Sequence, residues 1–370
     1  MEAALISLMA SGYSGGIMRT TIRLANAFHS KGYRVHLLSG NRDFPYAREL
    51  MPGILIKRIR TFNRISGIPF MMYYMLKNRP AVMLAGVIQH TVLAVRVKSL
   101  LRSQTRIYAA VRNPYSIGWA DHPPAKRALK IRNLKKYYPL TNGIISNSDS
   151  VARDFSVLAQ IPLSKIRTIY NPALDENIEE RMHQTFSHPW FKDKDLPLIL
   201  FVGRLEKQKN IPLLLAAFER VRQKTPCRLT IIGDGSLKTE LEEQVRTSAH
   251  PEDVDFLGFQ ENPFPFMERA DVMVLPSSWE GFGNVIVEAL ATGTPVVATD
   301  CPGGPGEILV DEKLGRLVPM DDPLAMAVAI EDLLRDPPPR KILRRAAERF
   351  AAPKIADEYL DAFGLAEYNR

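Results

Sequence analysis

Two carboxylates flank a glycine-rich loop in the second half of the chain. Glu280 opens the run Glu-Gly-Phe-Gly-Asn, and Glu288 lies further on, in an apolar segment with the period of a helix. Gly281 and Gly283 let the backbone turn tightly and approach a ligand, and the N–H groups at the start of the helix suit a phosphate. Glu280 would face polar groups beyond the phosphate, and Glu288 would accept hydrogen bonds from a pair of hydroxyls. Phosphates flanked by hydroxyl-rich groups describe a nucleotide sugar.

A glycine and two cations follow an earlier predicted strand, residues 198–202. Gly203 clears space at the carboxyl end of that strand, and Arg204 and Lys209 lie on either side of a predicted turn. Two cations converging on a diphosphate would offset the negative charge of a departing nucleotide. A solvated charged loop is the alternative interpretation, but the carboxylate loop described above favours the functional one.

The first half of the chain has another glycine-bearing loop, Ser11 to Arg19, between its first predicted strand and helix. The loop lacks the Gly-x-Gly-x-x-Gly spacing of dinucleotide-binding enzymes, which argues against a dehydrogenase. Gly16 still allows backbone N–H groups to approach a leaving phosphate or an acceptor. An ordinary flexible loop is the other interpretation.

The composition is typical of a globular protein with two domains. The chain has 370 residues, of which 46% are hydrophobic and 24% charged, and this length exceeds one ordinary core. Its longest apolar run, residues 68–76, is too short to cross a bilayer, and no signal peptide precedes the first predicted strand. The two cysteines, Cys227 and Cys301, lack metal-ligand spacing and are typical of a reducing compartment. We expect a cytoplasmic protein with no metal or organic cofactor.

The net charge of +9 is unevenly distributed. Residues 1–190 hold 27 Lys and Arg against 10 Asp and Glu, whereas the remainder holds 22 against 30. Only the first half is therefore expected to meet an anionic surface, such as the inner face of a membrane or a lipid diphosphate. Residues 126–138 interleave cations with apolar side chains, as helices on anionic headgroups do, although a solvated surface helix fits equally well. We expect no nucleic-acid partner, because no recognisable binding module occurs.

Short β-branched or aliphatic runs alternate with helical periods in both halves, which predicts parallel sheets covered by helices. The first half has predicted strands at residues 3–9, 34–38, 54–59, 82–86, 107–111, 143–147 and 166–169. Those of the second half lie at residues 198–202, 229–232, 254–257, 272–275, 296–298 and 315–318. Between them, Asp175–Pro197 lacks a clean period and is the predicted linker. Two doubly wound domains would face each other across a cleft, where ligands of such sheets bind.

Taken together, these motifs resemble those of family-4 retaining glycosyltransferases of the GT-B fold. The resemblance rests on Gly203-Arg204 with Lys209, on the paired glutamates and their glycine-rich loop, and on the Gly-Thr-Pro run that begins at Gly293. It implies an α/β architecture of two Rossmann-like domains. Residues 1–180 would bind an acceptor and residues 196–352 a nucleotide-sugar donor, and a C-terminal helix in residues 353–370 would cross back to the first domain.

The resemblance also implies roles for individual residues. Arg204 and Lys209 would bind the donor diphosphate, Glu280 the hydroxyls of the donor sugar, and Glu288 those of the ribose. Further donor contacts would come from Gly16, Gly203, Gly281, Phe282, Gly283 and Asn284. Such enzymes need no metal, because protein cations and helix dipoles take its place. They retain the anomeric configuration, with the leaving phosphate accepting the proton of the acceptor.

One stretch departs from the family pattern. Many members place a histidine after the strand that corresponds to residues 107–111, near the reacting sugar, but here Arg112 and Asn113 follow it. We assign both residues to the cleft. Asn113 can donate to a hydroxyl but cannot act as a general base. This variant resembles bacterial enzymes that build exopolysaccharide, O-antigen or lipid-linked oligosaccharide.

The expected activity is transfer of a hexose or N-acetylhexosamine from a nucleoside-diphosphate sugar, with UDP as the favoured nucleotide. The acceptor would be a lipid-linked or cell-surface saccharide, and the protein would associate peripherally with the inner face of the membrane. One alternative is a GT-B epimerase, which needs no acceptor, or a phosphorylase, which needs inorganic phosphate. Another is a non-catalytic subunit that binds sugar nucleotides and docks to membranes. A non-catalytic role is disfavoured because the four charged residues of the motif are intact: Arg204, Lys209, Glu280 and Glu288.

Overall fold

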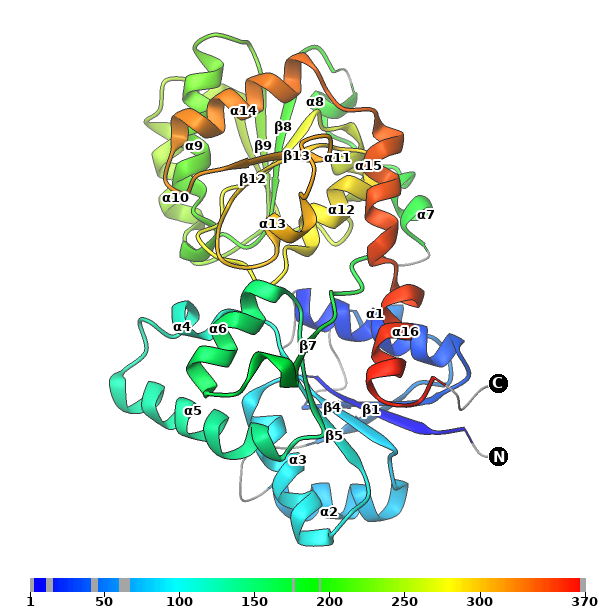
Figure 1. Cartoon of the computed structure of the whole chain (residues 1–370). Coiled ribbons are helices and arrows are strands. Elements are labelled where there is room, and N and C mark those ends of the chain that lie inside the picture. The colour runs from blue at the N-terminus through cyan, green and yellow to red at the C-terminus, as the bar shows by residue number, and fades with distance from the viewer. Residues whose placement is uncertain are drawn as a thin grey trace. The chain divides into compact units, whose positions relative to one another are not determined.

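The computed structural model describes residues 3–10, 16–40, 46–59, 67–174, 177–192 and 194–366. The chain divides into two compact units of α/β architecture (Figure 1). Unit 1 comprises Met1–Pro172 together with Ala352–Arg370, and unit 2 comprises Ala173–Ala351.

Unit 1 is built on a seven-stranded parallel sheet of order β3-β2-β1-β4-β5-β6-β7. Its strands are β1 Leu5–Met9, β2 Arg34–Ser39, β3 Leu55–Arg58, β4 Val82–Ala85, β5 Arg106–Val111, β6 Gly143–Ser146 and β7 Ile166–Thr168. The strand order reverses between β1 and β4. Ligands of doubly wound sheets bind outside the carboxyl ends of the strands at such a point.

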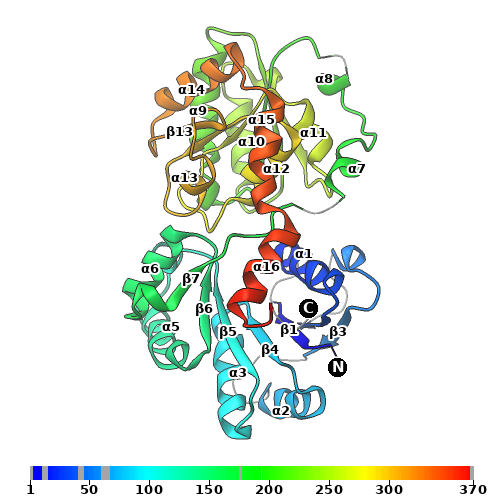
Figure 2. The same cartoon turned by 45° about the vertical axis from the view of Figure 1, so that its right-hand side comes forward.

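Helices cover both faces of this sheet. They are α1 Gly16–Ser30, α2 Gly67–Asn78, α3 Ile88–Leu101, α4 Tyr115–Gly118, α5 Pro124–Tyr137, α6 Asp149–Ala159 and α16 Ala352–Ala362. Leu8 of β1 shares a core cluster with α1 and α16, whereas its neighbour Met9 packs with α2 and α3, because successive strand residues face opposite sides. Both views place α16 beside α1 (Figures 1 and 2), and Phe363 just beyond it contacts the ring of Phe28. The last helix of the chain therefore completes the core of unit 1.

Unit 2 holds a six-stranded parallel sheet of order β10-β9-β8-β11-β12-β13. Its strands are β8 Leu198–Val202, β9 Arg228–Ile232, β10 Val254–Gly258, β11 Val272–Leu275, β12 Val296–Thr299 and β13 Gly315–Val318. Its helices are α7 Ile178–Met182, α8 Pro189–Lys192, α9 Ile211–Arg222, α10 Lys238–Arg246, α11 Phe264–Arg269, α12 Asn284–Thr292, α13 Pro305–Ile308, α14 Pro323–Arg335 and α15 Arg340–Ala347. Helices α9, α10 and α14 share one core cluster with the sheet, and α12 packs beside α11 and α15. The strand order reverses between β8 and β11.

The strand predictions are confirmed, with all thirteen strands present and their ends shifted by two residues at most. The predicted linker, Asp175–Pro197, contains two short helices, α7 and α8, that the sequence analysis did not predict. Phe191 of α8 is buried, and its ring lies 5.1 Å from that of Phe266 in α11. Scattered aromatic residues anchor this segment to unit 2, and they give no helical period in the sequence. No helix among the described residues is both long and apolar enough to cross a membrane.

Candidate functional site

Two loops leave the carboxyl edge of the unit 2 sheet next to each other. The first follows β8 and passes through a short 3-10 helix, Lys207–Lys209, into α9. The second follows β11 and leads into α12. β8 and β11 are hydrogen-bonded neighbours, so residues far apart in the sequence meet at the point where the strand order reverses.

Lys209 and Glu280 form a direct ion pair between these loops. Nζ of Lys209 lies 2.5 Å from Oε1 of Glu280, and the two side chains are only 12% and 8% exposed. Oγ of Ser277 donates to the same carboxylate oxygen at 2.7 Å. A buried ion pair of this kind adds little net stability, so its contribution to the fold does not account for the two charges.

Gln208 ties the two loops together. Its Nε2 donates to the carbonyl oxygen of Trp279 at 2.8 Å, and its backbone carbonyl accepts from the N–H of Ser278 at 2.9 Å. Its Oε1 accepts from Nη2 of the exposed Arg204 at 3.2 Å. Gln208 therefore positions Arg204 at the same edge as the ion pair. Sequence reasoning missed this residue because a single glutamine between two lysines matches no motif.

The loop after β12 braces the loop that carries Glu280. The N–H of Glu280 donates to the carbonyl of Pro302 at 2.9 Å. A Cβ added at Gly303, whose φ is +132°, would lie 2.1 Å from the carbonyl oxygen of Glu280, so only glycine fits this contact. Beside it, burial and the charge of Glu280 raise the pKa of the Cys301 thiol to about 12. Cys301 is therefore an inert packing residue at neutral pH.

The glycine-rich loop leads directly into α12. Gly283 is the N-cap residue and adopts a left-handed conformation with φ of 95°, which glycine reaches without strain. The ring of Phe282 is buried 5.2 Å from that of Phe350, so only its backbone can face a ligand. Asn284 begins the helix, and Glu288 lies one turn later, 7% exposed. The loop thus combines a helix N-terminus, suited to phosphate, with two buried carboxylates.

Gly203 keeps space open beside the lysine of the pair. A Cβ at this position would lie 3.0 Å from the ring of Phe201 and 3.6 Å from Cε of Lys209. Across from it, a Cβ at Gly233 would lie 1.8 Å from the carbonyl oxygen of Gly203. The turn after β9 therefore needs glycine for close packing against the backbone of Gly203.

The predicted residues of unit 1 lie at the carboxyl ends of its strands. Arg112 and the half-buried Asn113 directly follow β5, and the exposed Gly16 begins α1. His90 in α3 is buried and hydrogen-bonded to a backbone carbonyl, and burial lowers its pKa to about 4. It is a neutral packing residue at physiological pH. The loop Ser11–Gly15 lies outside the described residues.

The basic segment of unit 1 forms α5 and packs on its own unit. Leu134 is buried in a core cluster that Ile131 also contacts. Lys130 lies over the ring of Trp119, with Nζ 4.6 Å from its centroid. Four other cations of the helix are exposed: Lys126, Arg132, Lys135 and Lys136. The helix therefore presents charge to solvent, while its apolar side supports the fold.

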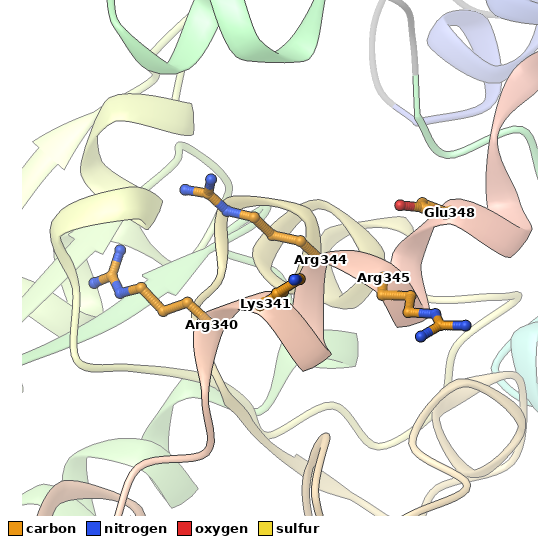
Figure 3. Close-up of a pocket in the computed structure, with 5 residues that line it drawn as sticks. All are labelled: Arg340, Lys341, Arg344, Arg345 and Glu348. Atoms are coloured by element: carbon orange, nitrogen blue, oxygen red, sulfur yellow. The ribbon is translucent and has the colours of Figure 1, made fainter.

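Another cationic cluster lies on α15 of unit 2. A cavity of about 400 Å³ is lined by Arg340, Lys341, Arg344, Arg345 and Glu348. Figure 3 shows Arg340 and Arg344 extending to one side and Arg345 to the other. Arg340 donates to the carbonyl of Glu268 and Arg344 to that of Thr292, so they attach α15 to α11 and α12. We interpret this cavity as a packing feature.

One group of described residues has metal-ligand spacing. His250, Glu252 and Asp253 place ligand atoms within 4.8 Å of one another. However, Oδ2 of Asp253 already pairs with Nε of Arg222 at 2.7 Å. The group precedes β10, at the opposite end of the strands from the ionic loops, so we do not connect it with the candidate site.

Comparison with known proteins identifies the family. The family described as "Glycosyl transferases group 1" matches residues 183–350, and that described as "Glycosyltransferase Family 4" matches residues 14–173. The lipopolysaccharide core biosynthesis glycosyltransferase LpsE of Rhizobium meliloti is 30% identical over 64% of this chain and 70% of its own. A Campylobacter jejuni enzyme, N-acetylgalactosamine-N,N'-diacetylbacillosaminyl-diphospho-undecaprenol 4-alpha-N-acetylgalactosaminyltransferase, is 35% identical. That match covers 60% of this chain and spans only 60% of the relative's length.

Solved structures share the fold. A glycosyltransferase from Rickettsia africae aligns over 100% of both chains with a TM-score of 0.79 at 16% identity. Anabaena HepE, solved in complex with UDP-glucose, aligns over 99% of this chain and 98% of its own, with a TM-score of 0.73 at 19% identity. The two parallel sheets with their covering helices are thus a two-domain α/β fold of the GT-B type. The chain belongs to family 4 of the glycosyltransferases.

Proposed function

We propose that this protein is a retaining glycosyltransferase that takes a hexose or N-acetylhexosamine from a UDP-sugar. The observation that carries the proposal is the buried Lys209–Glu280 pair at the reversal of strand order in unit 2. A cation, a carboxylate and a helix N-terminus meet there, and they match the diphosphate and the sugar hydroxyls of such a donor. The complex of HepE with UDP-glucose supports UDP as the nucleotide.

Donor binding would rearrange the ion pair. Lys209 would move from Glu280 to the diphosphate, where Arg204 supplies a second cation. The released carboxylate of Glu280 would accept hydrogen bonds from the sugar hydroxyls, and Glu288 would accept those of the ribose. These cations and the start of α12 neutralise the leaving group, so we propose that the reaction needs no metal.

Retention follows from front-face attack. The acceptor hydroxyl would bond to the anomeric carbon on the face from which the bond to the phosphate oxygen breaks. The departing phosphate oxygen would then take the hydroxyl proton, so no protein base is required. In unit 1, we propose that Gly16 and Asn113 contact the substrates. The side-chain amide of Asn113 would donate a hydrogen bond to a hydroxyl.

We propose a lipid-linked or cell-surface saccharide as the acceptor. The Campylobacter jejuni relative is named for a saccharide on diphospho-undecaprenol, and the Rhizobium meliloti relative for lipopolysaccharide core biosynthesis. A transfer assay tests this proposal. The protein is mixed in EDTA with UDP-N-acetylgalactosamine, UDP-N-acetylglucosamine, UDP-galactose or UDP-glucose, and undecaprenyl-diphosphate N-acetylhexosamine serves as the acceptor probe.

We expect one donor to be consumed and the lipid to be extended through an α-linkage, read by NMR of the anomeric proton. Inversion would contradict the mechanism. Conversion of one UDP-sugar into another without acceptor would identify an epimerase, and dependence on inorganic phosphate would identify a phosphorylase. A folded protein that consumes no donor would favour a non-catalytic subunit.

We further propose that unit 1 docks on the inner face of the membrane through the exposed cations of α5. Since the apolar side of α5 packs on its own unit, the contact would be electrostatic, with about 1 kcal/mol from each cation near the surface.

Reversing two of these charges, in Lys135→Glu/Lys136→Glu, should weaken binding to phosphatidylglycerol vesicles at low salt about thirtyfold or more. Co-sedimentation measures the bound fraction. The matched control is Lys341→Glu/Arg345→Glu, which reverses two exposed cations of α15 in unit 2 and should leave binding unchanged. Equal losses in both variants would mean that net charge, and not α5, drives the contact.

A further inference from the structure

A buried cation lies at the carboxyl edge of the unit 1 sheet. Arg112, directly after β5, is only 7% exposed. Its Nη1 donates to Oδ1 of Asn171 at 3.3 Å, and its Nε is buried with no hydrogen-bond partner among the described residues. Within the described part of the chain, Arg112 forms no ion pair. Burying a charge with so little compensation costs free energy of folding, so the presence of Arg112 at this position requires an explanation.

The next strand of the sheet adds an unsatisfied acceptor. Asn147 directly follows β6 and is 4% exposed. Its Nδ2 donates to the carbonyl oxygen of Arg112 at 3.2 Å, and its Oδ1 is buried without a hydrogen-bond partner in the part of the chain that the structure describes. Adjacent strand ends therefore carry one unsatisfied cationic donor and one unsatisfied acceptor. Buried polar groups are nearly always paired, so an unpaired donor and an unpaired acceptor on linked residues suit a ligand that offers both an anion and a hydroxyl.

The aromatic neighbours of Arg112 do not neutralise it. Burial raises the pKa of Tyr115 to about 12, although the Arg112 charge opposes the shift. Burial also raises the pKa of Tyr359 in α16, again against the Arg112 charge. Both phenols are uncharged at neutral pH, so neither supplies a counter-ion for the guanidinium.

We propose that Arg112 and Asn147 form a subsite for a glycosyl phosphate group carried by the acceptor. The guanidinium would bind two phosphate oxygens, the geometry to which it is suited, and Oδ1 of Asn147 would accept a hydrogen bond from a neighbouring sugar hydroxyl. The assignment of this group to the acceptor rests on the proposed function. The unsatisfied atoms and the buried charge do not depend on it.

Calorimetric titration with N-acetylglucosamine 1-phosphate tests the subsite without requiring turnover. The background protein is Arg204→Gln/Lys209→Met/Glu280→Gln, which removes the three charges assigned to donor binding in unit 2. We expect this protein still to bind the probe, and the further change Arg112→Gln to weaken binding about tenfold or more. Arg153→Gln, which removes an exposed cation of α6, should have no effect. N-acetylglucosamine without phosphate should bind more weakly than the probe.

Absence of probe binding in the background protein, or equal binding with and without Arg112→Gln, would overturn the subsite. Titration of the wild-type protein with UDP separately measures nucleotide affinity at the unit 2 loops. Failure of the subsite and failure of the proposed function are therefore distinguishable.

Thermal unfolding of Arg112→Met in the absence of ligand provides an independent readout. Because methionine removes the buried charge, we expect an unchanged or higher Tm. A lower Tm would mean that the guanidinium supports the fold, with water filling the gap, and would overturn the proposal.

Discussion

A Lys209→Met variant is expected to lose about a hundredfold or more in kcat/KM and about 3 kcal/mol in the free energy of unfolding. The rate should fall because the variant loses the cation that we propose stabilises the leaving diphosphate. Stability falls because the carboxylate of Glu280, only 8% exposed, keeps Ser277 Oγ but loses its counter-ion. Steady-state kinetics and urea unfolding measure the two effects.

A second substitution separates these effects. In Lys209→Met/Glu280→Gln the uncompensated charge disappears, so most of the stability should return while turnover stays low. Lys207→Met is the matched control, because Lys207 belongs to the same 3-10 turn and is exposed; it should retain both activity and stability. Near-normal turnover of Lys209→Met would contradict the site assignment.

A Gly303→Ala variant is expected to lose about 2–5 kcal/mol in the free energy of unfolding of unit 2 and to bind the donor more weakly. The added methyl group would lie 2.1 Å from the carbonyl oxygen of Glu280, so the loop must move. Gly258→Ala is the matched control. Gly258 also has a positive φ, of +65°, but nothing lies within 4 Å of an added Cβ, so this variant measures the cost of backbone strain without the cost of a steric clash. The control should lose about 1 kcal/mol, from backbone strain alone.

Chemical unfolding and titration with UDP measure both glycine variants. Equal destabilisation by the two substitutions, with UDP affinity unchanged, would mean that the Gly303 contact does not hold the donor loop in place.

Local patterns in the sequence predict the strands and the two loops of the candidate site. Runs such as residues 198–202 and 272–275 are short, apolar and bounded by turn residues, so each strand could be placed from its own composition. The glycine-rich loop was recognisable because glycine, carboxylate and helix start are consecutive. Features that depend only on neighbouring residues were therefore accessible from the sequence.

Contacts between distant segments could not be predicted from local patterns in the sequence. The sequence suggested that Lys209 converges with Arg204, but the pairing of β8 with β11 also brings Lys209 onto Glu280, 71 residues away. The brace at Gly303 likewise depends on the loop after β12 meeting the loop after β11. In the predicted linker, Asp175–Pro197, the ring of Phe191 packs against that of Phe266 and so attaches the segment to unit 2. Each case requires strand order or packing that no local pattern contains.

The most direct test of the central claim is a thermal-shift panel of UDP, GDP, ADP and their sugar conjugates, in EDTA, with wild type and Lys209→Met in parallel. A ligand that binds only the folded state adds about 2.7 kcal/mol of stability at a hundred times its dissociation constant. We predict that UDP and one UDP-sugar stabilise the wild-type protein and that Lys209→Met largely loses this effect. No stabilisation of the folded wild-type protein by any nucleotide or sugar nucleotide would contradict the account.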